Sequence, residues 1–350
     1  MVTKIFAGAA RGFGGSATAQ GGLFRRALGD DRWQKLAGGL PADAEIHAIG
    51  VHPGDAQVVY AGTHVGPYRT TDGGDKWTAV PFPDGAKEVW SFLFDPRDAR
   101  VMYAGTSPAA VYKSENGGDT WRKLGLKSAG HVKMSFDCRV TRMAADPSNP
   151  RELYAGLEVD GVMRSRDGGE TWEDVSQPLI KLADRPHLKS RIVSDTEIEG
   201  MMDSHALCVS SAAPGTVFLA VRMGVFRSAD RGATWEDMEI GRFSPLTYSR
   251  DVCVSPHNPH TLFTCLSPAA RSEDGSLYRS NDLGGSWKRV DRGVKARATM
   301  MSVALHAKDP EQIYCVSRCG QVFGTQDGGA RWQEYPLPEG TADAYTVACA

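Results

Sequence analysis

The sequence predicts an all-β fold, a single seven-bladed β-propeller of four-stranded antiparallel blades covering residues 1–350. The first observation is a repeat near 50 residues, because seven tryptophans recur at spacings of 44, 44, 51, 63, 52 and 45. These are Trp33, Trp77, Trp121, Trp172, Trp235, Trp287 and Trp332. The second is that six of them end the same short segment, clearest in SRDGGETW at 165–172. The third is that each end of the chain holds part of one repeat.

The repeat at residues 142–175 predicts four short strands, named A to D in chain order. A short apolar segment for strand A, 143–145, precedes the turn-forming residues DPSNP. Strand B follows as ELYAG, strand C as GVMRS and strand D as TWEDV. Short strands joined by turns at regular intervals indicate an antiparallel meander, and radial repetition of such sheets makes a propeller.

The segment between strands C and D suits a tight turn. Asp167 can accept hydrogen bonds from nearby backbone N–H groups, and Gly168 and Gly169 allow positive φ. Trp172 is large enough to fill the gap between blades. Equivalent segments lie at 70–77, 114–121, 228–235, 280–287 and 325–332, and an eroded copy lies at 27–33. We therefore expect Asp167 and its equivalents to be structural; Asn116 replaces the aspartate in one copy.

The two ends of the chain supply one blade between them. Residues 345–350 align with strand A, 4–8 with strand B, 22–26 with strand C and 33–36 with strand D. A ring closed in this way has no unpaired edge strand. We expect this shared blade to consist of 345–350 and 4–36.

On its turn segments the chain resembles the Asp-box (BNR-repeat) propellers, which include sialidases, xyloglucanases, sortilin-type receptors and a photosystem II assembly factor. The resemblance covers nearly the whole chain and implies that the turn aspartates lie away from a catalytic face. Sialidases of this kind have six blades and an Arg-Ile-Pro segment, which this sequence lacks, so sialidase activity is not expected. Xyloglucanases pair two propellers around a cleft with two acidic residues, and this chain would need a dimer to form one.

Composition excludes several classes of partner. The net charge of −2 provides no field for nucleic acid or an anionic membrane, so neither is an expected partner. No apolar run approaches the roughly 18 residues of a membrane-spanning helix. The start of the chain is a poor signal peptide, and the seven cysteines show no CxxC metal spacing. We expect a reducing, cytoplasmic location.

Variation in loop length predicts where ligands bind. In a meander blade the A–B and C–D turns share one face, and the B–C and D–A connections share the other, here called the upper face. Long upper connections are expected at 177–204, 266–276, 9–21 and 127–139. Long loops on a rigid scaffold usually carry binding or catalysis, so we expect the site there.

Alignment of the repeats places large polar side chains at the mouth of the central channel. The A strands contribute His47, Trp90, Thr141, His205, Arg250, Met301 and Tyr345. Positions two residues past strand B contribute His64, Ser107, Glu158, Arg222, Ser267 and Arg318. Charged neighbours are Glu45, Glu88, Asp203, Arg139 and Arg271.

These residues suggest chemical roles. The candidate acid/base groups are His205, Glu158, His47 and His64, which could alternatively share a divalent metal, although no HxH or HxxxH spacing supports that. No cofactor is required. The candidate substrate-binding residues are Arg222, Arg250, Arg318, Trp90 and Tyr345. The arginines either hold an anion or neutralise Glu158 and Asp203, and Trp90 either stacks on a sugar or plugs the channel.

Two functions follow, and the choice between enzyme and binding module stays open. The first is a hydrolase or lyase, glycosidase-like or metal-assisted, acting on a small polar or anionic substrate in the axial pocket. A glycosidase needs two carboxylates, and Glu158 with Glu88 or Asp203 are the candidates. The second is a non-catalytic interaction or assembly scaffold, with an exposed apolar patch built from Leu179, Ile180, Met201 and Met202. We expect a small-molecule or saccharide-like ligand and a monomer or homodimer.

Overall fold

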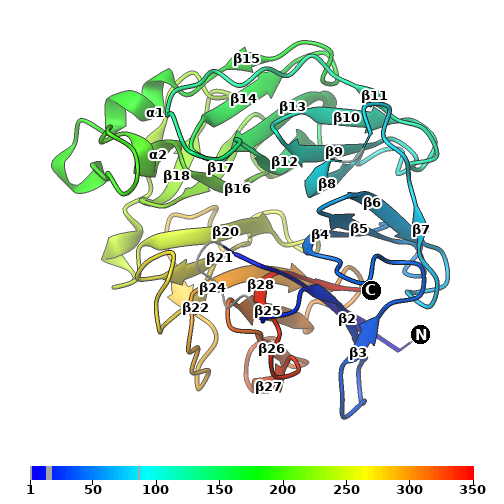
Figure 1. The fold of residues 1–350 in the computed structure, drawn as a ribbon. Coiled ribbons are helices and arrows are strands. Elements are labelled where there is room, and N and C mark those ends of the chain that lie inside the picture. The colour runs from blue at the N-terminus through cyan, green and yellow to red at the C-terminus, as the bar shows by residue number, and fades with distance from the viewer. Residues whose placement is uncertain (1, 13–17, 86) are drawn as a thin grey trace.

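The computed structural model describes residues 2–12, 18–85 and 87–350, and within them 28 strands form seven four-stranded antiparallel sheets arranged as a ring (Figure 1). The predicted seven-bladed propeller is therefore confirmed. Residues 13–17, part of the expected 9–21 connection, lie outside the described residues.

The blades follow one another along the chain. Blade I consists of β4 (Ile46–Val51), β5 (Val59–Thr63), β6 (Gly66–Thr70) and β7 (Thr78–Ala79). Blade II consists of β8 (Glu88–Phe94), β9 (Met102–Ser107), β10 (Val111–Ser114) and β11 (Arg122–Lys123). Blade III consists of β12 (Val140–Asp146), β13 (Asn149–Leu157), β14 (Gly161–Ser165) and β15 (Glu173–Asp174). Blade IV consists of β16 (Ser204–Val209), β17 (Val217–Val221), β18 (Gly224–Ser228) and β19 (Glu236–Asp237). Blade V consists of β20 (Tyr248–Val254), β21 (Leu262–Ser267), β22 (Ser276–Ser280) and β23 (Lys288–Arg289). Blade VI consists of β24 (Met300–Leu305), β25 (Ile313–Ser317), β26 (Gln321–Thr325) and β27 (Gln333–Pro336). Blade VII is β28 (Asp343–Cys349), β1 (Lys4–Ala10), β2 (Gly22–Ala27) and β3 (Gln34–Leu36). Short helices are α1 (Gln177–Leu182), η1 (Pro186–Leu188), α2 (Glu199–Met202) and η2 (Ile240–Arg242).

Blade VII joins the two ends of the chain, as expected, although its inner strands are longer than expected. Strand β28 pairs with β1 from Ile5 opposite Cys349 to Ala10 opposite Asp343. Beyond this ladder, the N–H of Lys4 donates to the carbonyl of Ala350 at 2.9 Å. Figure 1 shows both ends of the chain at this blade.

The hydrophobic core lies between neighbouring blades, and the repeated tryptophans belong to it. Trp121 of blade II packs with Tyr60 of blade I, and Trp77 of blade I packs with Phe6 and Leu23 of blade VII. Both indoles are buried. Each ring therefore removes apolar surface from water at a blade junction, which stabilises the closed ring.

The turn between strands C and D is held by its aspartate. In blade III, Asp167 Oδ1 accepts from the N–H of Thr171 at 2.9 Å, and Ser165 Oγ accepts from the N–H of Gly169 at 2.8 Å. Gly169 has a φ of +92°, which a residue with a side chain rarely adopts. The hydrogen bonds from Thr171 lower the pKa of the Asp167 carboxyl to about 2.

Replacing Asp167 by alanine is expected to lower the free energy of unfolding by about 1–2 kcal/mol, because the turn donors lose their acceptor. Asp167→Asn is the matched control, since Asn116 naturally occupies the same position in blade II and its Oδ1 accepts from the N–H of Thr120 at 2.9 Å. We expect the asparagine variant to lose less than half as much stability in urea denaturation. Equal losses would contradict the acceptor role.

The long connection between blades III and IV differs from expectation in which side chains it exposes. Leu179, Met201 and Met202 are fully buried and pack with strands of blades III and IV, and Ile180 is partly buried against the same cluster. These residues close the core beneath α1 and α2 and do not form the expected exposed apolar patch. None of the helices in the described part of the chain is long and apolar enough to cross a bilayer.

Candidate functional site

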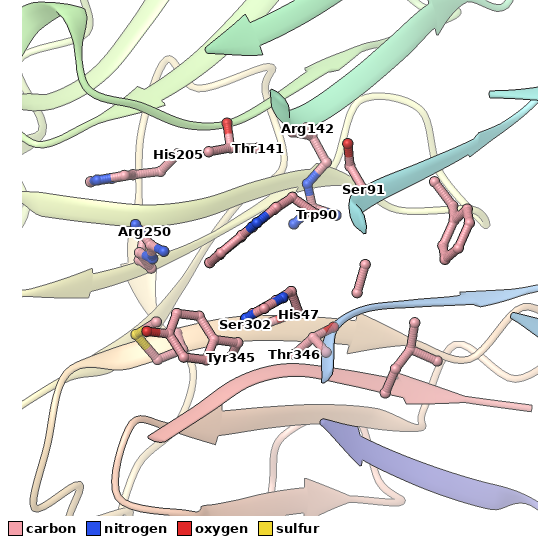
Figure 2. Close-up of a pocket in the computed structure, with 14 residues that line it drawn as sticks. His47, Trp90, Ser91, Thr141, Arg142, His205, Arg250, Ser302, Tyr345 and Thr346 are labelled. Atoms are coloured by element: carbon pink, nitrogen blue, oxygen red, sulfur yellow. The ribbon is translucent and has the colours of Figure 1, made fainter. Parts of the chain in front are cut away.

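The inner strands bring seven predicted side chains together at the channel mouth. His47, Trp90, Thr141, His205, Arg250, Met301 and Tyr345 all line one narrow cavity of about 80 Å³ (Figure 2). Each comes from the first strand of a different blade. The repeat aligns these positions because every blade presents its inner strand to the axis with the same register.

A stack of side chains covers Trp90. His47 lies parallel to the indole with ring centroids 4.0 Å apart, and the guanidinium of Arg139 lies over the same indole at 4.0 Å. The indole N–H donates to Glu88 Oε2 at 3.1 Å. Burial lowers the pKa of His47 to about 3, with Arg139 adding to the shift, so the stacked imidazole is neutral. The chain's own His47 and Arg139 therefore lie against the indole ring.

A larger cavity of about 590 Å³ adjoins the narrow one and shares His205, Arg250 and Tyr345 with it. It is lined from the connections before β12 and β16, from the B–C connections of blades III to VI, and from β16, β20 and β28. Its polar lining residues are Ser135, Arg139, Glu158, Glu199, Asp203, His205, Arg222, Tyr248, Arg250, Arg271, Arg318 and Tyr345. The D–A and B–C connections therefore share one face, as predicted, and the long 177–204 connection contributes to the cavity there.

A neighbouring cavity of about 350 Å³ is lined by the stacked residues His47, Trp90 and Arg139. It shares Phe136, Arg139 and Tyr345 with the larger cavity and is lined by Glu45 and Glu88. Ser107 lines this smaller cavity, and Asp137 and Arg11 complete its charged rim. The predicted acidic residues are therefore divided between two adjoining compartments.

Most arginines of the larger cavity are paired with carboxylates. Arg139 pairs with Glu158, Arg222 Nη2 lies 2.7 Å from Asp203 Oδ2, and Arg318 Nη1 lies 3.1 Å from Asp343 Oδ2. Arg271 lies 3.5 Å from the same Asp343 oxygen. Arg250 makes no hydrogen bond and no ion pair with the described residues. Arg222 and Arg318 therefore neutralise carboxylates, and Arg250 is the guanidinium left over.

The two carboxylates of the cavity, Glu158 and Asp203, have pKa values displaced in opposite directions. Burial raises the pKa of Glu158, and the charge of Asp203 raises it further, against the opposing effect of Arg139. Burial alone would raise the pKa of Asp203, but the nearby His205 and the charges of Arg222 and Arg250 hold it well below its ordinary value. Of the two carboxyl groups, Glu158 is therefore the more readily protonated and Asp203 the more readily ionised.

His205 packs against Asp203. Its Nδ1 lies 2.7 Å from the carbonyl oxygen of Ser249 and its Nε2 lies 3.2 Å from Asp203 Oδ2, so both ring nitrogens face acceptors and only the protonated ring can donate to both. The hydroxyl of Tyr248 lies 3.3 Å from Nε2. Burial lowers the pKa of His205, although the Asp203 carboxylate opposes that shift; the side chain is only 1% exposed, so His205 does not meet a ligand directly.

The structure does not assemble the predicted metal alternative. His64 accepts through Nδ1 from the N–H of Glu45 at 3.2 Å, while His205 bonds within blades IV and V. Across residues 2–12, 18–85 and 87–350, no group of three or more His, Cys, Asp and Glu side chains could hold a metal ion. His47, His64, His205 and Glu158 thus have separate environments.

Glu199 is a part of the site that the sequence did not reveal. Its Oε2 accepts from the N–H groups of Ile192, Val193 and Ser194 at 2.9, 3.1 and 3.0 Å. This carboxylate shapes the loop so that Ile192 and Val193 stand at the cavity, 54% and 68% exposed. Tyr248 was also missed, although its position two residues before Arg250 on one strand was a signal, because alternate residues share a face.

Comparisons with known proteins point to glycoside hydrolases and to the propeller fold. No family model matches the chain. A xyloglucanase of Hypocrea jecorina is 25% identical over 85% of this chain and 39% of its own length. An oligoxyloglucan-reducing end-specific xyloglucanase of Emericella nidulans is 22% identical, covering 83% and 40%. The chain therefore spans about two fifths of the length of these curated relatives.

Solved structures show the same fold in proteins of different kinds. The GH74 xyloglucanase from Xanthomonas campestris aligns with a TM-score of 0.63 at 19% identity, covering 85% of this chain and 46% of that one. YCF48 from Cyanidioschyzon merolae aligns with a TM-score of 0.58 at 13% identity, covering 88% and 90%. A structure of YCF48 bound to D1 peptide gives 0.55 at 16% identity, covering 88% and 85%. These likenesses establish the fold.

Proposed function

We propose that this chain is a glycosidase-like hydrolase that acts on a saccharide in the 590 Å³ cavity of the upper face. The observation that carries the proposal is the pair of carboxylates, Glu158 and Asp203, which line one cavity with opposed pKa shifts. Glycoside hydrolysis needs one protonated carboxylic acid and one carboxylate, and opposed pKa values assign those roles.

Glu158 would act as the general acid. Its side chain is 19% exposed at the cavity, and Arg139 holds it in position. Its raised pKa makes it the better of the two carboxyl groups to give a proton to the leaving oxygen of the glycosidic bond.

Asp203 would be the ionised partner, either as nucleophile or as base for water. Arg222 Nη2 donates to Oδ2 at 2.7 Å, whereas Oδ1 is buried and has no hydrogen-bond partner within the described chain. One oxygen is therefore fixed by Arg222, and the other is an acceptor that the described residues leave unpaired.

The relatives support a saccharide as the ligand class. Those reported above are named for xyloglucan, a polysaccharide, which replaces the small substrate expected at first. Each relative is more than twice as long as its match to this chain, so the activity is proposed here for a single propeller. Glycoside hydrolysis by the two carboxyl groups assigned above would require no metal and no organic cofactor.

We also infer that the chain belongs with the Asp-box propellers and works in a reducing compartment. The first inference is supported by turn hydrogen bonds that recur around the ring, such as Asp230 Oδ1 with the N–H of Thr234 at 2.7 Å and Asp282 Oδ1 with that of Ser286 at 2.9 Å. The second is supported by seven free cysteines, of which Cys265, Cys315 and Cys349 are buried.

A second function, binding of a partner protein, is favoured by one observation. Ile192 and Val193 are large, exposed apolar side chains at the rim of the cavity. Exposed apolar groups beside a charged pocket suit a peptide as well as a sugar. In that case the same cavity would bind its ligand without cleaving it.

Wild-type protein is expected to release reducing sugar from xyloglucan or from another plant cell-wall oligosaccharide. Asp203→Asn should lower that rate at least about 100-fold, because the ionised partner is lost. Glu88→Gln is the matched control, since Glu88 lines the neighbouring cavity and should leave the rate nearly unchanged. Absence of hydrolysis across a broad glycan panel, with a folded protein, would contradict the proposal and favour the binding module.

A further inference from the structure

The guanidinium of Arg250 has no counter-charge of its own in the larger cavity. We propose that Arg250 binds a carboxylate of the substrate, and therefore that the saccharide contains a uronic acid residue. This deepens the proposed function, on which the choice of a saccharide rests, and it names a substrate class different from the neutral glycan in the relatives' names.

The charges around the cavity support this assignment. Five arginines line the cavity together with three carboxylates; they are Arg139, Arg222, Arg250, Arg271 and Arg318, with Glu158, Glu199 and Asp203. Asp343 pairs with Arg318 and Arg271, and Glu199 accepts backbone N–H groups of its own loop. After these pairings one guanidinium is left without a carboxylate among the described residues.

The position of Arg250 is fixed by the fold. It is the third residue of β20, where the side chain lines the narrow channel cavity (Figure 2). The same side chain also lines the larger cavity. Burial opposes its charge, but Tyr248, Asp203 and Glu158 keep its pKa above the ordinary value, so it stays protonated. Arg250 is partly buried and lines the cavity with N–H donors that no side chain of the described residues uses, and a carboxylate offers the two-oxygen acceptor that a guanidinium fits best.

Two further arginines of this cavity keep unpaired donors. The Nε–H groups of Arg222 and Arg318 are buried and have no partner within the described chain. Both side chains line the cavity with Arg250. A carboxylate bound there could accept from several N–H groups, because Arg222 uses only one nitrogen on Asp203 and Arg318 only one on Asp343.

A bound carboxylate would also act on the chemistry. Arg250 lowers the pKa of both Glu158 and Asp203 through its charge. Neutralising Arg250 with a substrate carboxylate would remove that effect and favour the protonated form of Glu158. The acid would then be most fully protonated when the correct substrate is in place.

The test uses a matched pair of ligands, a short oligogalacturonide and the same oligosaccharide after reduction of its carboxylates to hydroxymethyl groups. Calorimetry on the full chain should show the acidic ligand binding at least about tenfold more tightly. Arg250→Gln should remove that preference while leaving affinity for the reduced ligand unchanged, and Arg250→Lys should keep part of it. Arg227→Gln is the control, because Arg227 pairs with Glu236 away from the cavity and should preserve the preference.

The outcomes separate this inference from the proposed function. Equal affinity for both ligands, or a preference that survives in both Arg250 variants, would overturn it. Binding of an acetylated dipeptide through its free carboxylate, without binding of the oligogalacturonide, would overturn it in favour of a peptide. If neutral glycans are cleaved and uronides are not, the hydrolase stands and the uronate assignment fails. If the uronide binds through Arg250 and is never cleaved, the carboxylate site stands and the hydrolase fails.

Discussion

Deleting residues 343–350 is expected to unfold the protein or convert it into oligomers. This segment is the innermost strand of blade VII and pairs along its length with β1, which the N-terminus supplies. Ala344, Val347 and Cys349 lie in a buried cluster with Phe24 of the same blade and Tyr314 of blade VI. Their removal would expose this cluster and leave β1 as an unpaired edge strand on the channel.

The expected loss is large relative to the stability of a domain. Burying a side chain of the size of Val347 contributes roughly 1.5–3 kcal/mol, and typical domains are stable by about 5–15 kcal/mol. The smaller Ala344 and Cys349 contribute less, but their loss adds to that of Val347 and of the backbone hydrogen bonds between β28 and β1. Together these losses are a large part of the stability of a domain. Circular dichroism and analytical ultracentrifugation would measure the result. Adding the missing segment as a peptide should restore part of the signal, whereas a well-folded monomer of unchanged Tm would refute closure of the ring by the shared blade.

Replacing Glu158 by glutamine is expected to lower kcat for glycoside hydrolysis by about 10²–10⁴-fold. Glutamine keeps the size of the side chain and can still accept from Arg139, but it has no proton to give to the leaving oxygen. KM and Tm should change little, because the amide occupies the same place at the cavity wall. Steady-state kinetics with thermal melting would establish both points, and a variant with wild-type kcat would remove Glu158 from the mechanism.

The pH profile gives a second measure of the same pair. The raised pKa of Glu158 predicts that activity persists above the ordinary pKa of a glutamic acid and falls as pH rises through the raised value. The lowered pKa of Asp203 predicts that the acidic limb lies below the ordinary pKa of about 3.9 for aspartate. Any residual activity of Glu158→Gln should lack the alkaline limb.

The repeat predicted the positions of the side chains more reliably than their partners. Each blade presents the same strand to the axis, so aligning the repeats was enough to place His47, Trp90, Arg250 and Tyr345 in one cavity. Alignment could not show that His47 and Arg139 cover Trp90, because Arg139 comes from a loop of another blade.

The sequence by itself determined the number of blades, the closure of the ring by both ends of the chain and the structural role of the turn aspartates. These features depend on turn-forming residues and on strand periodicity, both of which are determined by residues close together in the sequence. Only the tertiary structure decided which charges pair. Asp203 pairs with Arg222 and Asp343 with Arg318, whereas Arg250 has no ion-pair partner among the described residues. Asp343 and Arg318 belong to different blades, and ion pairing across a ring depends on distances between separate sheets, which local periodicity does not contain.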